Sequence, residues 1–348
     1  MTLRPLAACA VVLGLALAGA PRRAFAGSVT DEVTVGRTFA QGTKFYGDRL
    51  AALFEPSERL SLRTAASVMR YEPVRRSGGE TVLQLSAGGT LQLSDAWAVG
   101  LDVNGAPPAT ASSAPRATLD DGSGTPTPVT LDVKTRTSSF GGSATVEYAR
   151  GTDTDHETVV DATLGATAYD VTNRIAGARS TTGAPLGSAS CGATGCAPDV
   201  ARSLDRDTVA LAQLRASVGL TQTLRDATDV DVVATYYGYT DDPTQVGILS
   251  VGTFGRAAVA GGIPTLPLRW SARAAVLHRL GAWGVGGSLQ HGQFIDREGY
   301  GDIGGLRAEW RFAAAWKGWL SAYAERDAGP ALAATWTAWC GAGARVRF

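Results

Sequence analysis

This sequence has few charged residues and few long apolar runs, and these two shortages narrow the choice of fold class. Only 18% of the 348 residues are charged although 45% are hydrophobic, whereas about a quarter of the residues of a soluble domain are charged. Beyond the N-terminal segment no apolar run approaches the roughly 20 residues of a membrane-spanning helix. The apolar residues must therefore be spaced regularly along the chain, and their spacing indicates the fold class.

The N-terminal segment predicts export. Arg4 provides a positive charge, Leu6–Ala20 is apolar, and Ala24-Phe25-Ala26 has the small-x-small pattern of a signal-peptidase site. We therefore expect residues 1–26 to be a secretory signal peptide and the mature chain to start at Gly27. Removal of three arginines makes the formal charge of zero slightly negative, which argues against a nucleic-acid partner.

The C-terminal segment alternates strictly. Every even position from Leu332 to Phe348 is apolar, and the odd positions are mostly polar or small. Because successive strand side chains point to opposite faces, this pattern predicts a strand with one apolar and one polar face. The same alternation recurs in residues 83–93, 160–168, 212–220, 268–276 and 306–316.

An alternating strand that ends on a terminal aromatic residue resembles the last strand of bacterial outer-membrane β-barrels. The resemblance implies that Phe348, with Val346 and Trp336 on the same face, forms the signal that the barrel-assembly machinery reads. It also implies outer-membrane lipid as the surroundings of the folded chain. The resemblance is to the broad porin-like class and singles out no particular family.

Soluble antiparallel sandwiches also alternate, but two features favour a barrel. The alternating runs suit the roughly 9–11 residues of a tilted membrane strand, and their arginines share a face with Ser, Thr, Gln and Gly, as in a wet interior. We therefore predict that residues 27–348 form an all-β, closed antiparallel transmembrane barrel of about 14 strands, within a range of 12–16.

Connection lengths support this topology, because every second connection is short and the remaining set contains all the long ones. Transmembrane barrels have short periplasmic turns and long outer loops. The expected short turns include Trp316-Lys317, and the expected long loops are Gly105–Asp132, Thr172–Thr208, Asp241–Pro267 and Ile295–Asp302. Residues 247–260 could form a further hairpin and raise the count to sixteen.

Aromatic residues gather at the predicted periplasmic strand ends, which predicts an interfacial belt. The residues concerned are Trp97, Tyr148, Trp283, Trp316, Trp319 and Phe348.

The sequence offers no good catalytic or metal site. A hydrolase needs a nucleophile and an orienting group around one histidine, but Ser288 lies on the opposite strand face from His291. Acidic residues near His156 do not match a calcium loop, so we expect neither an enzyme nor a metal nor a cofactor. Cys191 and Cys196, in the longest outer loop, are expected to form a disulfide in an oxidising periplasm, with free thiols as the alternative.

Charged residues on the polar strand faces are the candidate functional residues. Such rings bias which solutes enter a pore, although the charges could instead simply pair across the lumen. The predicted pore-lining set is Arg215, Arg269, Arg273, Arg307, Glu309, Arg311, Asp161 and Gln213. The pattern favours a channel for small hydrophilic solutes with mild anion preference. The alternative is a non-conducting barrel that presents its long outer loops to a surface partner, and the oligomeric state stays open.

Overall fold

A computed structural model describes most of the chain beyond the predicted signal peptide. The described residues are 26–39, 43–72, 80–113, 116–119, 127–151, 156–180, 185–186, 206–225, 227–241, 248–250, 256–258, 268–295, 299–329 and 332–348. Residues 1–25, Cys191 and Cys196 lie outside them. In these ranges no helix is long and apolar enough to cross a membrane.

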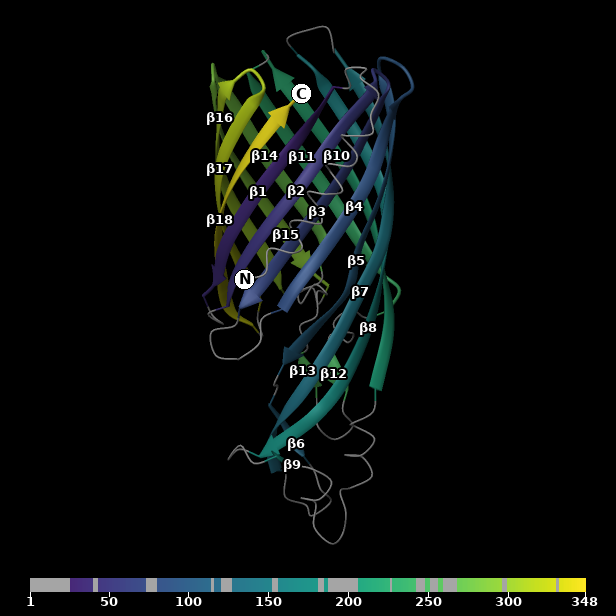
Figure 1. Cartoon of the computed structure of the whole chain (residues 1–348), viewed down its shortest axis with the longest axis vertical. Helices are drawn as coiled ribbons and strands as arrows, with labels where there is room; N and C mark the ends of the chain where they lie inside the picture. The colour runs from purple at the N-terminus through teal and green to yellow at the C-terminus, as the bar shows by residue number, and fades with distance from the viewer. Residues whose placement is uncertain are drawn as a thin grey trace.

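The described residues form one large antiparallel sheet and a separate two-stranded sheet (Figure 1). Fourteen strands make the barrel: β1 (Ala26–Thr38), β2 (Lys44–Ser57), β3 (Leu60–Glu72), β4 (Glu80–Gln92), β5 (Trp97–Ser113), β7 (Thr127–Arg150), β8 (Thr158–Ser180), β10 (Arg206–Leu224), β11 (Thr228–Tyr239), β14 (Leu268–Leu280), β15 (Trp283–Phe294), β16 (Tyr300–Ala313), β17 (Trp316–Gly329) and β18 (Leu332–Arg347). The short strands are β6 (Arg116–Leu119), β9 (Pro185–Leu186), β12 (Ile248–Ser250) and β13 (Arg256–Ala258).

The barrel closes because its first and last strands pair. Ser28 of β1 lies opposite Arg347 of β18, and pairing continues as far as Thr38 opposite Thr337. On the other side β7 pairs with β8 along most of its length. Since every pair is antiparallel and no barrel strand is left with an open edge, the predicted fold class is confirmed.

Connection lengths sort between the two rims largely as the sequence predicted, but the prediction of a long loop at Ile295–Asp302 was wrong, because β16 already begins at Tyr300. Six short turns, residues 58–59, 93–96, 151–157, 225–227, 281–282 and 314–315, lie at one rim, which we call the turn rim. The longest connections lie at the opposite rim, called the loop rim. The last of these turns is at Ala314-Ala315, so the prediction of a turn at Trp316-Lys317 was wrong by two residues.

Two of the expected long loops contain strand residues at their ends. Residues 105–113 continue β5, Thr127 begins β7, and β8 runs to Ser180, so these strands project beyond the loop rim (Figure 1). Pro107 and Pro108 lie where the pairing of β5 with β7 shifts register between Ala106 and Ala109. Proline lacks the N–H that a ladder needs, and a bulge tolerates this loss. Pairing then resumes.

The possible extra hairpin exists but stays outside the barrel. Ile248–Ser250 pairs with Arg256–Ala258 in a sheet of their own. The barrel therefore keeps fourteen strands, and the alternative of sixteen is wrong.

Outward side chains form an apolar surface in the predicted phase. Four leucines are among the most exposed, namely Leu101, Leu164, Leu289 and Leu306, whose exposed fractions are 68%, 68%, 72% and 71%. In water such a surface would be unfavourable. In lipid it is the expected outer face of a barrel.

Aromatic residues frame this apolar surface at both rims. At the turn rim Trp97 contacts Tyr148 at 4.9 Å between ring centroids, and Trp283 stacks on Trp310 at 5.5 Å. At the loop rim Trp270 and Tyr300 both contact the His291 ring, at 5.4 and 5.9 Å.

The spacing of these two belts suits a membrane. Tyr300 and Trp310 are ten residues apart on β16. At the strand rise and tilt of such barrels this spans about 25 Å, the height of the apolar band of known outer-membrane barrels.

The assignment of Trp319 to the belt was wrong. It is three residues from Trp316 and therefore on the other face, and it is only 8% exposed.

Candidate functional site: the inward face of the barrel

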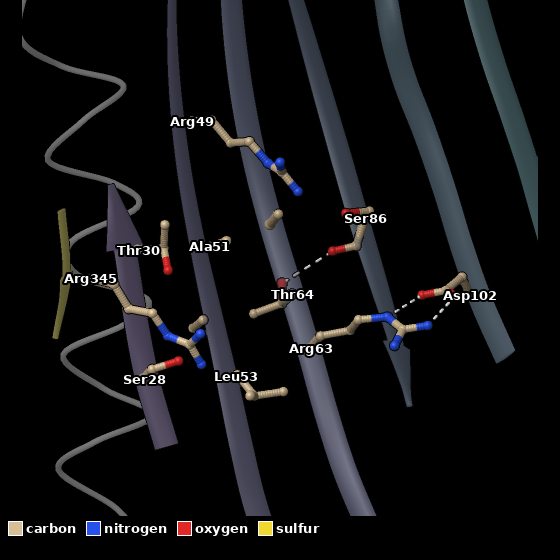
Figure 2. A pocket seen from close by; sticks show the side chains of 12 residues that line it. Ser28, Thr30, Arg49, Ala51, Leu53, Arg63, Thr64, Ser86, Asp102 and Arg345 are labelled. Atoms are coloured by element: carbon tan, nitrogen blue, oxygen red, sulfur yellow. Dashed lines mark hydrogen bonds and ion pairs between the residues drawn. The ribbon is translucent and has the colours of Figure 1, made fainter. Parts of the chain in front are cut away.

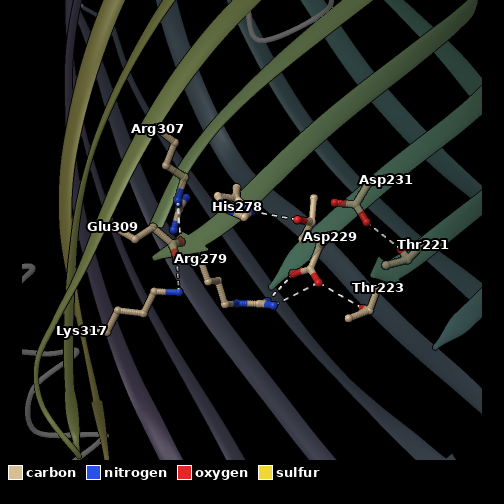
Figure 3. A network of polar contacts seen from close by, with 10 residues as sticks. Thr221, Thr223, Asp229, Asp231, His278, Arg279, Arg307, Glu309 and Lys317 are labelled. Carbon is tan, nitrogen blue, oxygen red and sulfur yellow. Dashed lines mark hydrogen bonds and ion pairs between the residues drawn. The ribbon is translucent and has the colours of Figure 1, made fainter. Parts of the chain in front are cut away.

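The inward face carries a network of charged side chains near the turn rim (Figure 3). Nε of Arg307 donates to Oε1 of Glu309 at 2.9 Å, and the Lys317 ammonium pairs with the other carboxylate oxygen. The Glu309 side chain is only 9% exposed, so this carboxylate depends on its two cationic partners. Because one carboxylate pairs with two cations, the cluster of Arg307, Glu309 and Lys317 keeps a net positive charge.

Arg307 is also held by an aromatic ring. Its guanidinium carbon lies 4.8 Å from the centre of the Trp319 ring, a cation–π contact. Trp319 in turn lies directly over Gly343, because a Cβ added there would be 2.3 Å from the indole. The glycine thus makes room for the ring that positions the arginine.

A second ion pair joins β11 and β14 in the same view (Figure 3). Nη1 of Arg279 donates to Oδ1 of Asp229 at 3.2 Å, and the Thr223 hydroxyl donates to the same oxygen at 3.1 Å. Two residues further along both strands, Thr221 donates to Asp231 at 2.7 Å. Paired charges of this kind make the inward face hydrophilic without adding to its net charge.

The eight predicted pore-lining residues all lie on this inward face. Residues an even number of positions apart on a strand point to the same face, that is, they have the same parity. Arg269 and Arg273 therefore share the face of Arg279 on β14, and Gln213 and Arg215 share the face of Thr221 on β10. Arg311 shares the face of Arg307 on β16. Asp161 faces Gly219, where a Cβ would lie 2.1 Å from its carboxylate. The structure brings together only Arg307 and Glu309. Arg215, Arg269, Arg273 and Arg311 are spread along the wall and make no ion pair among the described residues.

A third ion pair, on the opposite side of the lumen, joins β3 to β5 across the intervening strand β4 (Figure 2). Nε of Arg63 donates to Oδ1 of Asp102 at 2.7 Å, and its Nη1 donates to the Thr90 hydroxyl at 3.2 Å. Asp102 is on β5, and β4 lies between the partners. Gly88 occupies the intervening position, where a Cβ would be 2.0 Å from the carboxylate.

Near the loop rim the inward face becomes more apolar. Val171 and Leu211 are 0% and 2% exposed, and Tyr169 and Tyr239 pack against them. The Tyr239 hydroxyl donates to the carbonyl of Leu268 and accepts from Gln213 Nε2, both at 3.0 Å. This cluster adds apolar side chains to the inward faces of β8, β10 and β11.

The histidines do not assemble a hydrolytic site in the described residues. His291 Nδ1 lies 2.7 Å from Asp302 Oδ1, but both side chains share the outward face with Leu289, and Ser288 has the opposite parity. His278 Nδ1 contacts the Thr228 hydroxyl at 2.8 Å. In the described part of the chain no three His, Cys, Asp or Glu side chains gather as metal ligands do.

Sequence reasoning missed Asp229, Arg279 and Lys317 as members of the charged network. Asp229 and Arg279 share the parity of Asp231 and Arg273, so extending the alternation to the strand ends would have found them. Lys317 was assigned to a turn because the boundary of β17 was placed too late.

No protein-family model matches the sequence, and no curated protein matches it. Solved structures do share its fold. The CymD monoaromatic hydrocarbon channel is 10% identical with a TM-score of 0.55, over 94% of this chain and 89% of that chain. A FadL homologue of Pseudomonas aeruginosa is 10% identical with a TM-score of 0.54, over 93% and 90%. The toluene transporter TodX of Pseudomonas putida is 13% identical with a TM-score of 0.52, over 95% and 92%. At such identities the likeness establishes a bacterial outer-membrane barrel fold and nothing finer.

Proposed function

We propose that this chain is a passive channel of a bacterial outer membrane through which small hydrophilic solutes diffuse, with a modest preference for anions. The observation that supports it is the contrast between the two faces of one closed barrel. Leucines such as Leu289 cover the outward face, whereas Arg, Asp, Glu and Thr line the inward face. A polar lumen inside an apolar shell suits the passage of water-soluble molecules across lipid.

The strand number supports an open lumen. Barrel diameter grows with strand number, and eight strands leave space only for side chains or one small ligand. A fourteen-stranded barrel is therefore wide enough for water and small solutes. Among the similar proteins, CymD is a monoaromatic hydrocarbon channel and TodX is a toluene transporter. We propose hydrophilic solutes for this chain because charged side chains project from its wall.

The anion preference rests on the unpaired arginines. Arg307 shares the Glu309 carboxylate with Lys317, whereas Arg269 and Arg273 make no ion pair among the described residues. These two are four residues apart on one face of β14, which places them about 13 Å apart along the strand. They form a positive ladder that attracts anions at low salt and is screened at high salt.

Single-channel recording in planar bilayers tests the proposal. We expect defined conductance steps and a reversal potential that favours anions at low salt. Replacing Arg269 and Arg273 with Gln should reduce that preference and leave the yield of heat-modifiable barrel unchanged. A cation-selective wild type, or unchanged selectivity in the double variant, would contradict the anion preference.

A docking role is the second candidate. The projecting ends of β5, β7, β8 and β10, with β6 and β9 beside them, extend well beyond the loop rim (Figure 1). Such a surface could bind an extracellular partner without any flow through the barrel. A folded barrel that shows no conductance would favour this role and overturn the channel.

A further inference from the structure

The barrel wall contains a recess of about 340 Å³ on the inward faces of β18 and β1 to β5 (Figure 2). Its floor consists of small side chains on four consecutive strands. Thr30 lies opposite Ala51, Ala51 opposite Ala65, and Ala65 opposite Ser86. Because none of these side chains extends far from the backbone, the wall is hollowed along this row.

Three arginines from three different strands surround this floor. Arg345 lies opposite Thr30 in the register of β18 with β1. Arg49 is two residues before Ala51 on β2, and Arg63 is two residues before Ala65 on β3, so each shares the inward face of the floor. All three line the recess. Figure 2 shows their guanidinium groups around it.

The three arginines differ in how their charges are compensated. Arg63 is fixed by Asp102 and Thr90. Arg49 and Arg345 make no ion pair within the described part of the chain, although Glu32 lies opposite Arg49 in register. Nε of Arg345 is buried and has no hydrogen-bond partner there. A buried donor without a partner is costly, and Arg345 thus lacks both an ion pair and a partner for this donor.

We propose that this recess is a transient binding site, on the permeation path, for a small organic anion that carries a carboxylate or phosphate group. The proposal rests on the channel function proposed above. Arg49 and Arg345 supply the two uncompensated positive charges and donate to the anionic group. The hydroxyls of Ser28, Thr30 and Ser86 line the same space and can bond to the polar remainder of the solute.

The size of the recess favours an organic anion over a simple inorganic ion. Its volume of about 340 Å³ lies at the lower end of the range of small-molecule sites. Its openness to the lumen allows a solute to leave as well as enter, which conduction requires.

Current block by added solutes tests the recess. Succinate and glucose 6-phosphate are added to single wild-type channels in planar bilayers, with glucose as the uncharged control. We expect both anions, but not glucose, to interrupt the current at millimolar concentration. The Arg49→Gln, Arg345→Gln double variant should need about tenfold more anion for the same block, because charge-assisted hydrogen bonds are lost. Block by only one anion identifies which anionic group the recess accepts.

A matched control separates the recess from general luminal charge. The Arg215→Gln, Arg311→Gln double variant removes the same charge from other parts of the wall, and it should retain most of the block. Equal block in the wild type and the recess variant would overturn the proposal. An equal loss of block in both double variants would do so too.

The channel and the recess can fail separately. A barrel that conducts but is not blocked keeps the proposed function and overturns the recess. If the barrel does not conduct, calorimetric titration of the detergent-solubilised barrel with succinate decides the recess alone. Binding heat that the recess variant loses would support it, and absence of binding heat would overturn it.

Discussion

Leu289 and Gln290 are neighbours on β15 whose side chains point to opposite faces, and they provide the sharpest test of the fold. Leu289 is 72% exposed on the outward face. It lies six residues after Trp283 of the turn-rim belt, which is about 15 Å along the membrane normal at the usual strand tilt. That depth is close to the middle of an apolar band about 25 Å thick.

The substitution Leu289→Arg places a charge near the midplane and should destabilise the barrel by about 2–4 kcal/mol. This corresponds to a decrease of roughly 30- to 1,000-fold in the folding equilibrium constant. Gln290→Arg introduces the same side chain on the wet face and should cost less than about 1 kcal/mol, since lumen changes mainly alter permeation. Leu289→Ala separates the loss of apolar contact, about 1–2 kcal/mol, from the effect of the charge.

The assay is reversible urea unfolding in lipid vesicles, followed by tryptophan fluorescence and by heat-modifiable migration on gels. The free energy of unfolding should rank wild type and Gln290→Arg well above Leu289→Arg. If Gln290→Arg were the more damaging variant, the side-chain phase of β15 would be wrong by one residue, since a slip of one position exchanges the two faces.

Two further predictions concern single positions. Deleting Phe348, or replacing it with Asp, should strongly lower the amount of membrane-inserted barrel, and wild-type levels of heat-modifiable protein would remove this residue from the proposed assembly signal. Gly343→Val should cost about 1–3 kcal/mol by overpacking, because its Cβ would lie 2.3 Å from Trp319 and 2.8 Å from the backbone oxygen of Asp31. Unfolding titrations measure this cost, and an unchanged midpoint would mean that Trp319 has another position.

Alternation alone predicted most of the fold, because a strand has only two faces and lipid imposes a strong preference on one of them. The phase assigned to Arg307 and Leu306 from the sequence is the phase in the structure. Trp319 was misplaced because closeness to a strand end was given more weight than parity. Trp316 and Trp319 are three residues apart and cannot share a face.

Strand length was harder to predict than strand phase. The segment that follows Gly105 is rich in Pro, Ser and Thr, a composition that usually marks a loop. In the structure Ala109–Ser113 pairs with Val133–Thr137 of β7 after the irregularity at the two prolines. Local composition could not reveal this pairing, since the ladder depends on a partner strand more than twenty residues away.

Charge pairing shows where sequence reasoning stops. Arg307 and Glu309 are two positions apart on one strand, so their contact could be foreseen. Arg63 and Asp102 are on β3 and β5, with β4 between them, and a side chain on β4 would normally separate them. Gly88 removes that obstacle, because a Cβ there would be 2.0 Å from Asp102 Oδ1.

The glycine therefore determines which charges on this wall are compensated. With Asp102 held by Arg63 across Gly88, that pair is neutral, and the positive character of the recess comes from Arg49 and Arg345. A side chain at position 88 would displace Asp102 from Arg63 and leave Arg63 as a third uncompensated arginine at the recess. The number of uncompensated arginines at the recess thus depends on a residue that carries no charge, and a count of arginines along the sequence could not have shown this.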